Sequence, residues 1–151
     1  MGVLRRIRRL RRRDAVLLWQ ALGAVLLARA HLWRGAHGDL RRLIEAHPIP
    51  DPALPASRAD LAEVAWSVRN AARLVPGATC LTQASAGQLL LARRGLATTI
   101  RLSVPAQAAA PGRLAPHAWL MAGDIIVLGG TAEDYTRHRT LHDFTLPGAR
   151  T

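Results

Sequence analysis

Residues 76–95 have the sequence PGATCLTQASAGQLLLARRG, and this stretch decides the fold that we expect. Its Pro-Gly pair forms a tight turn, and Thr79 is a residue type that caps helix N-termini. A helix is therefore expected to begin at Cys80 and to end near Arg94, with Gly95 as its C-terminal stop. This places a thiol in the first turn of a helix.

The position of Cys80 gives it two possible roles. The free N–H groups and the positive end of the helix dipole favour a thiolate, and the same N–H groups could hold the oxyanion of a tetrahedral intermediate. A lone cysteine is equally well explained as a small buried apolar side chain. The sequence around Cys80 leaves both roles open.

The chain has 151 residues, of which half are apolar and 21% are charged. This composition suits one compact domain and excludes wholesale disorder. Because Cys80 is the one cysteine, a disulfide within the chain is excluded. A single thiol suits a reducing compartment, so we expect a cytoplasmic protein.

The net charge of +11 comes from arginine, since the chain has no lysine. Seven of the 21 arginines lie in residues 1–13, which leaves 14 arginines against 10 acidic residues in the remainder. We expect residues 1–13 to form a basic arm. The arm is either simply solvated or a docking surface for acidic peptide, nucleic acid or anionic lipid.

An apolar run follows the arm at residues 15–28. As a helix it would span about 21 Å, less than the ~30 Å core of a bilayer. The run also imitates a secretory signal, but Asp14 and Gln20 interrupt it and its periodicity continues past the imitated cleavage site. We predict a buried helix over residues 14–34, with Asp14 as its N-cap and Gly35 at its end.

The remaining pattern predicts further helices and then strands. Ser57 followed by Asp60 is a variant capping box for a helix that runs to about Leu74. The other expected segments are a helix at residues 39–47, a proline-rich connection at 47–55, a strand at 96–104, a loop at 105–116, and a hairpin of strands 117–121 and 125–128. The sequence therefore predicts an α+β fold with a small antiparallel sheet.

His117 is the histidine that we expect to act with Cys80. A thiolate nucleophile needs an imidazole nearby to take up and return protons, and the fold can bring together residues that are far apart in sequence. His117 shares one face of the expected hairpin with Trp119 and Met121. Trp119 would either shield the imidazole from water or simply pack.

Four blocks of this sequence resemble the lasso-peptide leader peptidases, the stand-alone protease form of the microcin-maturation B protein. The blocks are WSVRNAAR at residues 66–73, PGATCL at 76–81, LLLARRG at 89–95 and HAWL at 117–120. The similarity covers roughly residues 10–146. It implies a transglutaminase/papain-like core at residues 51–151, in which a nucleophile helix packs on the sheet, joined in one unit to a helical section at 14–50.

The resemblance also implies a function. Such an enzyme removes the leader from a ribosomally made lasso-peptide precursor, with Cys80 as nucleophile and His117 as general base and acid. Expected partners are the precursor, a small winged-helix-like leader-recognition protein acting in trans, and an ATP-dependent cyclase. The arginine arm or the first helices could help to dock the recognition protein, and the arm could contact a membrane surface.

The resemblance also implies a third catalytic residue, an aspartate about a dozen residues after the histidine, and this sequence departs from that pattern. The residues expected opposite His117 are 128–130, and none of them is a carboxylate. Asp124 lies in the hairpin turn, more than about 10 Å from His117 at ~3.3 Å per residue. Asp134, in a following loop, is a weak candidate. We expect either Asp134 or a backbone carbonyl to orient the imidazole.

No cofactor, metal or nucleic acid is expected. His138 and His142 have a spacing that zinc sites use, but further ligands are missing and both suit a solvated C-terminal turn. No phosphate-binding loop is present. Two other function classes remain: an acyltransferase on the same scaffold, and a non-catalytic peptide-binding module that uses its arginine-rich arm.

Overall fold

The computed structural model describes residues 11–107 and 115–147. Its helices and strands follow the order α2 (Arg12–Trp33), α3 (His37–Glu45), α4 (Arg58–Ala72), α5 (Cys80–Arg93), β1 (Thr99–Pro105), β2 (His117–Ala122), β3 (Ile125–Leu128), α6 (Ala132–Thr136) and β4 (His138–Thr145). The predicted α+β class with a small antiparallel sheet is confirmed. Most of the basic arm, residues 1–10, and the centre of the expected loop, residues 108–114, lie outside the described residues.

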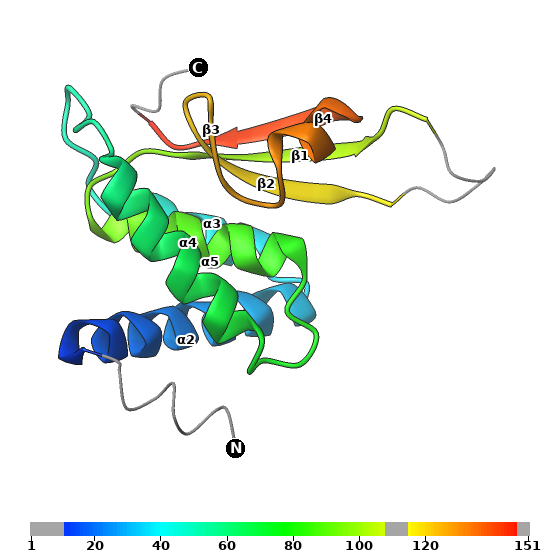
Figure 1. Ribbon diagram of the computed structural model, residues 1–151. Helices are drawn as coiled ribbons and strands as arrows, with labels where there is room; N and C mark the ends of the chain where they lie inside the picture. Colours follow the sequence, from blue (N-terminus) through cyan, green and yellow to red (C-terminus); the bar gives the residue numbers. More distant parts are fainter. Residues whose placement is uncertain (1–10, 108–114, 148–151) are drawn as a thin grey trace.

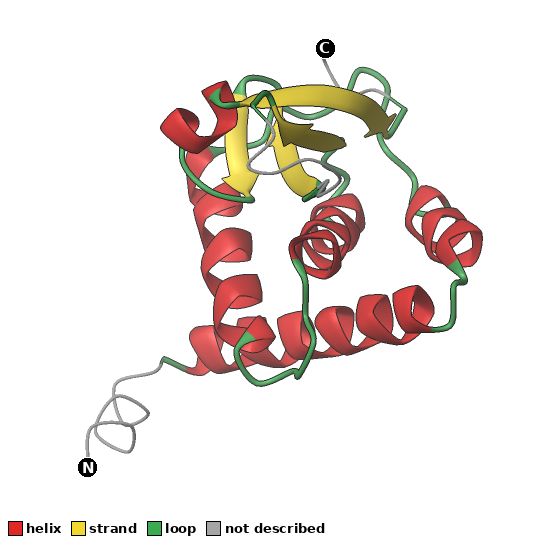
Figure 2. Ribbon diagram, turned by 90° about the vertical axis from the view of Figure 1, so that its right-hand side faces the viewer, coloured by secondary structure: helices red, strands yellow, loops and turns green. Residues whose placement is uncertain are grey.

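The strands form one antiparallel sheet in the order β3-β2-β1-β4. Helices α2 to α5 all lie on one side of it (Figure 1). Helix α5 packs directly on the sheet, and α2 crosses the end of the molecule farthest from the sheet (Figure 2). The core therefore lies between the helices and one face of the sheet.

Helix α5 is the centre of this core, because ten of its 14 residues are buried. Gly87 lets it approach the sheet closely. A Cβ at Gly87 would lie 2.6 Å from Cδ2 of Leu120 and 2.8 Å from Cδ1 of Leu128, both fully buried. Close packing of this kind holds the helix that begins with Cys80 in a fixed place on β2 and β3.

The capping residues act largely as the sequence predicts. The Thr79 side chain accepts the Thr82 N–H, and the Ser57 side chain accepts the Asp60 N–H. Gly35 and Gly95 follow their helices with φ of +70° and +74°, in the left-handed region that glycine adopts readily.

Asp14, however, is not the N-cap of its helix. Helix α2 begins two residues before it, so the Asp14 carboxylate lies in the first turn and accepts the backbone N–H of Arg11, 3.0 Å away. The arginines before Asp14 tolerate the helical conformation well, which explains the earlier start. Arg13 forms an ion pair with Glu63 of α4, so this end of the basic arm is part of the fold.

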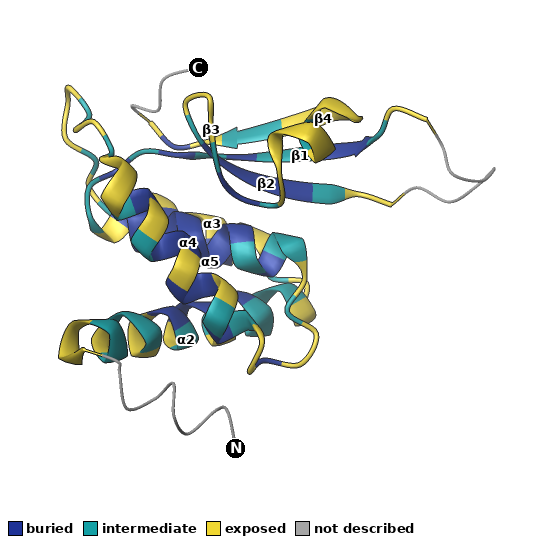
Figure 3. Cartoon of the chain, viewed as in Figure 1, coloured by how far each residue is buried: buried dark blue, intermediate teal, exposed yellow. Residues whose placement is uncertain are grey.

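The expectation of a buried helix after the arm holds for one side of α2. Its buried residues are Ala21, Ala24, Val25 and Ala28. Trp19 and Trp33 are 74% and 75% exposed. Apart from its buried residues, α2 is intermediate in burial or exposed, and its N-terminal end is exposed (Figure 3). By length and composition, α2 is the one helix among the described residues that could cross a membrane.

The C-terminal part differs most from the expectation. Asp134 lies in α6 instead of a loop, and His138 and His142 lie on β4 instead of a turn. β4 pairs with β1 at the edge of the sheet, with a shift in register between Leu102 and Ser103. No residue of β4 is fully buried. A strand without a buried face needs no alternation of apolar and polar residues, so the sequence gives no clear signal for a strand there.

Candidate active site

Cys80 is the first residue of α5, directly after the Thr79 N-cap. The Gln83 N–H donates to the Thr79 carbonyl at 3.0 Å, so the N–H groups of Cys80 and Leu81 precede the first hydrogen bond of the helix. The thiol is free and half-buried. The thiol therefore lies beside unpaired backbone N–H groups at the start of α5.

His117 is the first residue of β2 and pairs with Ser103 of β1. His117 and Cys80 line the same pocket, which has a volume of about 240 Å³. The pocket is completed by Arg69, Gln83, Leu128, Gly129 and Gly130. The fold therefore brings the two residues, 37 positions apart in sequence, to one half-open cavity.

One hydrogen bond sets the orientation of the imidazole. Nε2 of His117 lies 2.6 Å from the carbonyl oxygen of Gly129. A carbonyl oxygen only accepts, so Nε2 carries the proton in this bond. The neutral ring then has its lone pair on Nδ1, which is the nitrogen that can take a proton from a thiol.

Glycine at position 129 makes this contact possible. Gly129 has φ of +124°, which side chains other than hydrogen rarely allow. A Cβ there would lie 2.8 Å from Cε3 of Trp119 and 3.0 Å from the Ala118 carbonyl oxygen. The backbone can approach β2 at this point only because the side chain is absent.

Neither candidate carboxylate is bonded to His117. Oδ2 of Asp134 accepts the Thr131 hydroxyl at 2.7 Å and the Thr131 N–H at 3.1 Å, which closes the capping box of α6. The hydrogen bond from the Thr131 hydroxyl is the main reason that the pKa of Asp134 is lowered. Asp124 lies in the turn between β2 and β3.

A polar and aromatic cluster supports the far side of His117. The ring centroids of His117 and Trp119 are 4.5 Å apart, and those of His117 and His138 are 5.6 Å apart. The buried Trp119 indole N–H donates to Oγ of Ser103 at 2.7 Å, and that oxygen is hydrogen-bonded to Nδ1 of His138 at 3.0 Å. Trp119 thus both packs and closes one side of the imidazole.

Several residues near the site have no role predicted from the sequence. Gln83 follows Cys80 by three positions on the same helix, a spacing that places two side chains on one face and that could have identified it. Arg69 lines the pocket and donates to the Val127 carbonyl at 3.3 Å. Ser103 and His138 reach the site through pairing of β1 with β2 and β4, which no local pattern indicates.

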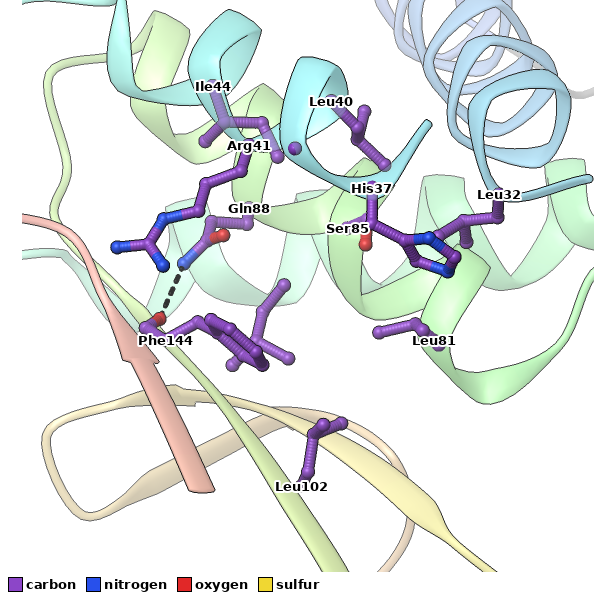
Figure 4. A pocket seen from close by; sticks show the side chains of 12 residues that line it. Leu32, His37, Leu40, Arg41, Ile44, Leu81, Ser85, Gln88, Leu102 and Phe144 are labelled. Atoms are coloured by element: carbon purple, nitrogen blue, oxygen red, sulfur yellow. Dashed lines mark hydrogen bonds between the residues drawn. The ribbon is translucent and has the colours of Figure 1, made fainter. Parts of the chain in front are cut away.

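A second, more apolar pocket of about 330 Å³ lies between α3, α5 and the strands β1 and β4 (Figure 4). Leu81 and Leu102 line it, and within it the Gln88 amide donates to the Phe144 carbonyl at 3.4 Å. Neither Cys80 nor His117 lines this pocket. Both residues line the smaller cavity instead.

The described residues contain no group of three or more histidine, cysteine or acidic side chains that could hold a metal ion. His138 is hydrogen-bonded to Ser103, and the His142 ring packs against Phe144 with centroids 4.5 Å apart. On a helix, i, i+4 spacing would place the two histidines side by side, as zinc sites require. His138 and His142 lie on the strand β4, where the same spacing holds them apart.

Comparison with known proteins gives one match. Residues 24–142 match the core of the transglutaminase-like superfamily. No curated protein and no solved structure matches the chain.

Proposed function

The chain belongs to the transglutaminase-like superfamily, whose core spans residues 24–142 and supports cysteine-protease and acyltransferase chemistry; on this premise we propose that it is a cysteine peptidase. Its proposed substrate is a lasso-peptide precursor, from which it removes the leader. The observation that carries the proposal is that Cys80 and His117 line one open pocket, with the imidazole held by the Gly129 carbonyl.

The arrangement supports a two-step hydrolysis. Nδ1 of His117 takes the proton of the Cys80 thiol, and the sulfur attacks the carbonyl carbon of the scissile bond. The N–H groups at the start of α5 stabilise the resulting oxyanion, with the Gln83 amide as a further donor. His117 then gives the proton to the leaving amine, and a thioester to Cys80 remains.

Water completes the cycle. His117 removes a proton from a water molecule, whose oxygen attacks the thioester carbon, and the proton returns to the Cys80 sulfur as the carboxylate product leaves. The Nε2–H bond to Gly129 keeps the ring oriented through both steps. In this scheme the carbonyl takes the orienting role that a carboxylate has in catalytic triads.

We further propose that leader recognition is supplied by a separate small winged-helix-like protein, and that the reaction takes place in the cytoplasm. The described elements form a helical layer and a sheet around the Cys80 site. The freed core peptide would then pass to an ATP-dependent cyclase. These partners rest on the resemblance of the four sequence blocks.

The superfamily match equally supports acyl transfer. In an acyltransferase, an amine instead of water would attack the Cys80 thioester. The two reactions differ in the mass of their products. After hydrolysis, the summed mass of the products exceeds that of the precursor by one water, whereas transfer joins the acyl piece to the amine without adding water.

The test is incubation of the full chain with a precursor peptide and a recognition protein encoded next to it, followed by mass spectrometry. We expect site-specific hydrolysis that needs the recognition protein and falls by at least about 10³-fold in Cys80→Ala and in His117→Ala. His142→Ala is the matched control, since this histidine lies outside the pocket. Full activity of Cys80→Ala would refute the peptidase and favour a binding role for the arginine arm.

A further inference from the structure

Helix α2 lies along the edge of the molecule away from the sheet (Figure 3). On the side opposite its buried alanines it carries a stripe of largely exposed apolar residues. We call this surface the α2 stripe; its residues are Val16, Trp19, Gly23, Leu26, Ala30 and Trp33. Val16 and Leu26 are half exposed and both tryptophans are about three-quarters exposed. No charged residue occurs between Asp14 and Arg29. An apolar surface of this length marks an interaction site.

Gly23 is the most informative residue of the stripe. It lies in the middle of a 22-residue helix, where glycine is unfavourable compared with alanine. Nothing among residues 11–107 and 115–147 explains it, because a Cβ at Gly23 would have no atom of these residues within 4 Å. A glycine with open space around it is explained if another backbone or large side chain approaches from outside.

The spacing of the α2 stripe alternates between three and four residues. This is the spacing of the a and d positions that form the seam between two helices. Large and small residues also alternate along the seam. The stripe therefore has the form of one half of a helix–helix contact.

We propose that two copies of this chain associate through their α2 stripes, antiparallel and related by a two-fold axis. The axis passes between Gly23 and Leu26, so each Leu26 lies against Gly23 of the other copy. The same symmetry places Trp19 against Ala30, and Trp33 against Val16. Each of these contacts then joins a large side chain to a smaller one, and each occurs twice, as the two-fold symmetry of an isologous interface requires.

A parallel arrangement fits poorly. It would place each residue against its own copy, so that Trp19 meets Trp19 and Gly23 faces Gly23 across a gap. It would also bring the two arginine-rich N-termini together, with seven positive charges each. Antiparallel pairing separates these charges by the length of α2, about 33 Å, and aligns the helix dipoles favourably.

The area is sufficient for a specific contact. A tryptophan buries about 150–250 Å². Both tryptophans, with Leu26 and Val16, from two copies give about 1,000 Å², the lower limit for a specific interface. A lipid surface is the competing occupant, but it gains nothing from a glycine at position 23.

The test is the mass of the full chain in solution, measured by sedimentation equilibrium from 1 to 100 µM. We expect twice the 16.4 kDa of one chain at the upper concentrations. Gly23→Leu should return the protein to monomer, with at least a tenfold higher dissociation constant. Leucine at position 23 adds exposed apolar surface and favours the helix. If the chain associated non-specifically or bound membranes through this surface, the variant would therefore strengthen that association and not weaken it.

The double variant Gly23→Leu with Leu26→Gly exchanges the large and small residues of one layer, so it should restore the dimer. Leu141→Ala, on the distant strand β4, is the control and should leave the mass unchanged. A monomeric wild type would overturn the proposal, whether or not it binds phosphatidylglycerol vesicles or a recognition protein. A dimer that survives Gly23→Leu would also overturn it, because association would then use another face.

Discussion

His117 and Gly129 are joined by a hydrogen bond of 2.6 Å between the imidazole Nε2 and the backbone carbonyl oxygen. The bond links the start of β2 to the residue that follows β3. It fixes the tautomer of the ring with a group that does not titrate. Four predictions test this arrangement and the packing around it.

Gly129→Ala should disable the site. The added Cβ would collide with Trp119 and with the Ala118 carbonyl, and φ of +124° is strained for alanine. The carbonyl must then move away from His117, and we expect kcat for precursor cleavage to fall about 10–100-fold, because small misplacements of catalytic groups are costly. Gly38→Ala is the control, since its Cβ would meet no atom within 4 Å. Wild-type kcat in Gly129→Ala would show that the bond is unnecessary.

Asp134→Ala and Asp124→Ala should each keep kcat within about twofold, because neither carboxylate is bonded to the imidazole and general-base catalysis depends on such contacts. Asp134→Ala should lower the melting temperature slightly by opening the capping box with Thr131. Activity and thermal unfolding are measured on the same samples. A tenfold loss of kcat in Asp134→Ala, with the fold intact, would identify Asp134 as the third catalytic residue.

Asp143 should contribute stability that disappears in acid. Its carboxylate accepts two hydrogen bonds from Arg101, at 2.6 and 2.8 Å, and this lowers the pKa of Asp143. Because the folded pKa lies below the ordinary value of 3.8, the stabilisation is complete above that value and is lost as the pH falls through the lower one. Solvent reaches about a third of both side chains, so we expect about 1 kcal/mol.

The measurement for Asp143 is urea unfolding at pH 7 and pH 3. In Asp143→Asn the difference in unfolding free energy between these pH values should shrink by about 1 kcal/mol compared with the wild type. Asp124→Asn, in the hairpin turn, should leave that difference unchanged. An equal pH dependence in wild type and Asp143→Asn would show that the pair with Arg101 contributes nothing.

Gly87→Ala should destabilise the fold, although alanine is the better helix former. The new Cβ would lie under 3 Å from methyl groups of Leu120 and Leu128, which are fully buried. We expect a loss of about 1–2 kcal/mol in urea unfolding. Combining it with Leu120→Val should recover part of that loss, because the valine is shorter. Increased stability in Gly87→Ala would mean that α5 is less closely packed on the sheet.

The sequence by itself determined the elements that local signals control. Thr79 and Ser57 mark helix starts, Gly35 and Gly95 mark helix ends, and the alternation at residues 117–128 gives a hairpin. Side-chain caps and glycine conformations act within a few residues, so they are visible in one dimension. Cys80 at a helix start follows from these signals alone.

Only the tertiary structure decided which groups surround the two candidate catalytic residues. β4 has no fully buried residue to signal it, and its place beside β1 brings His138 to the imidazole. The Gly129 carbonyl is a backbone group, which every residue has, so no residue type indicates that this one lies 2.6 Å from His117. The contact with His138 depends on how β4 pairs with β1. Gly129 lies opposite His117 across the predicted hairpin, but the direction of its carbonyl depends on its backbone conformation and on its close approach to β2.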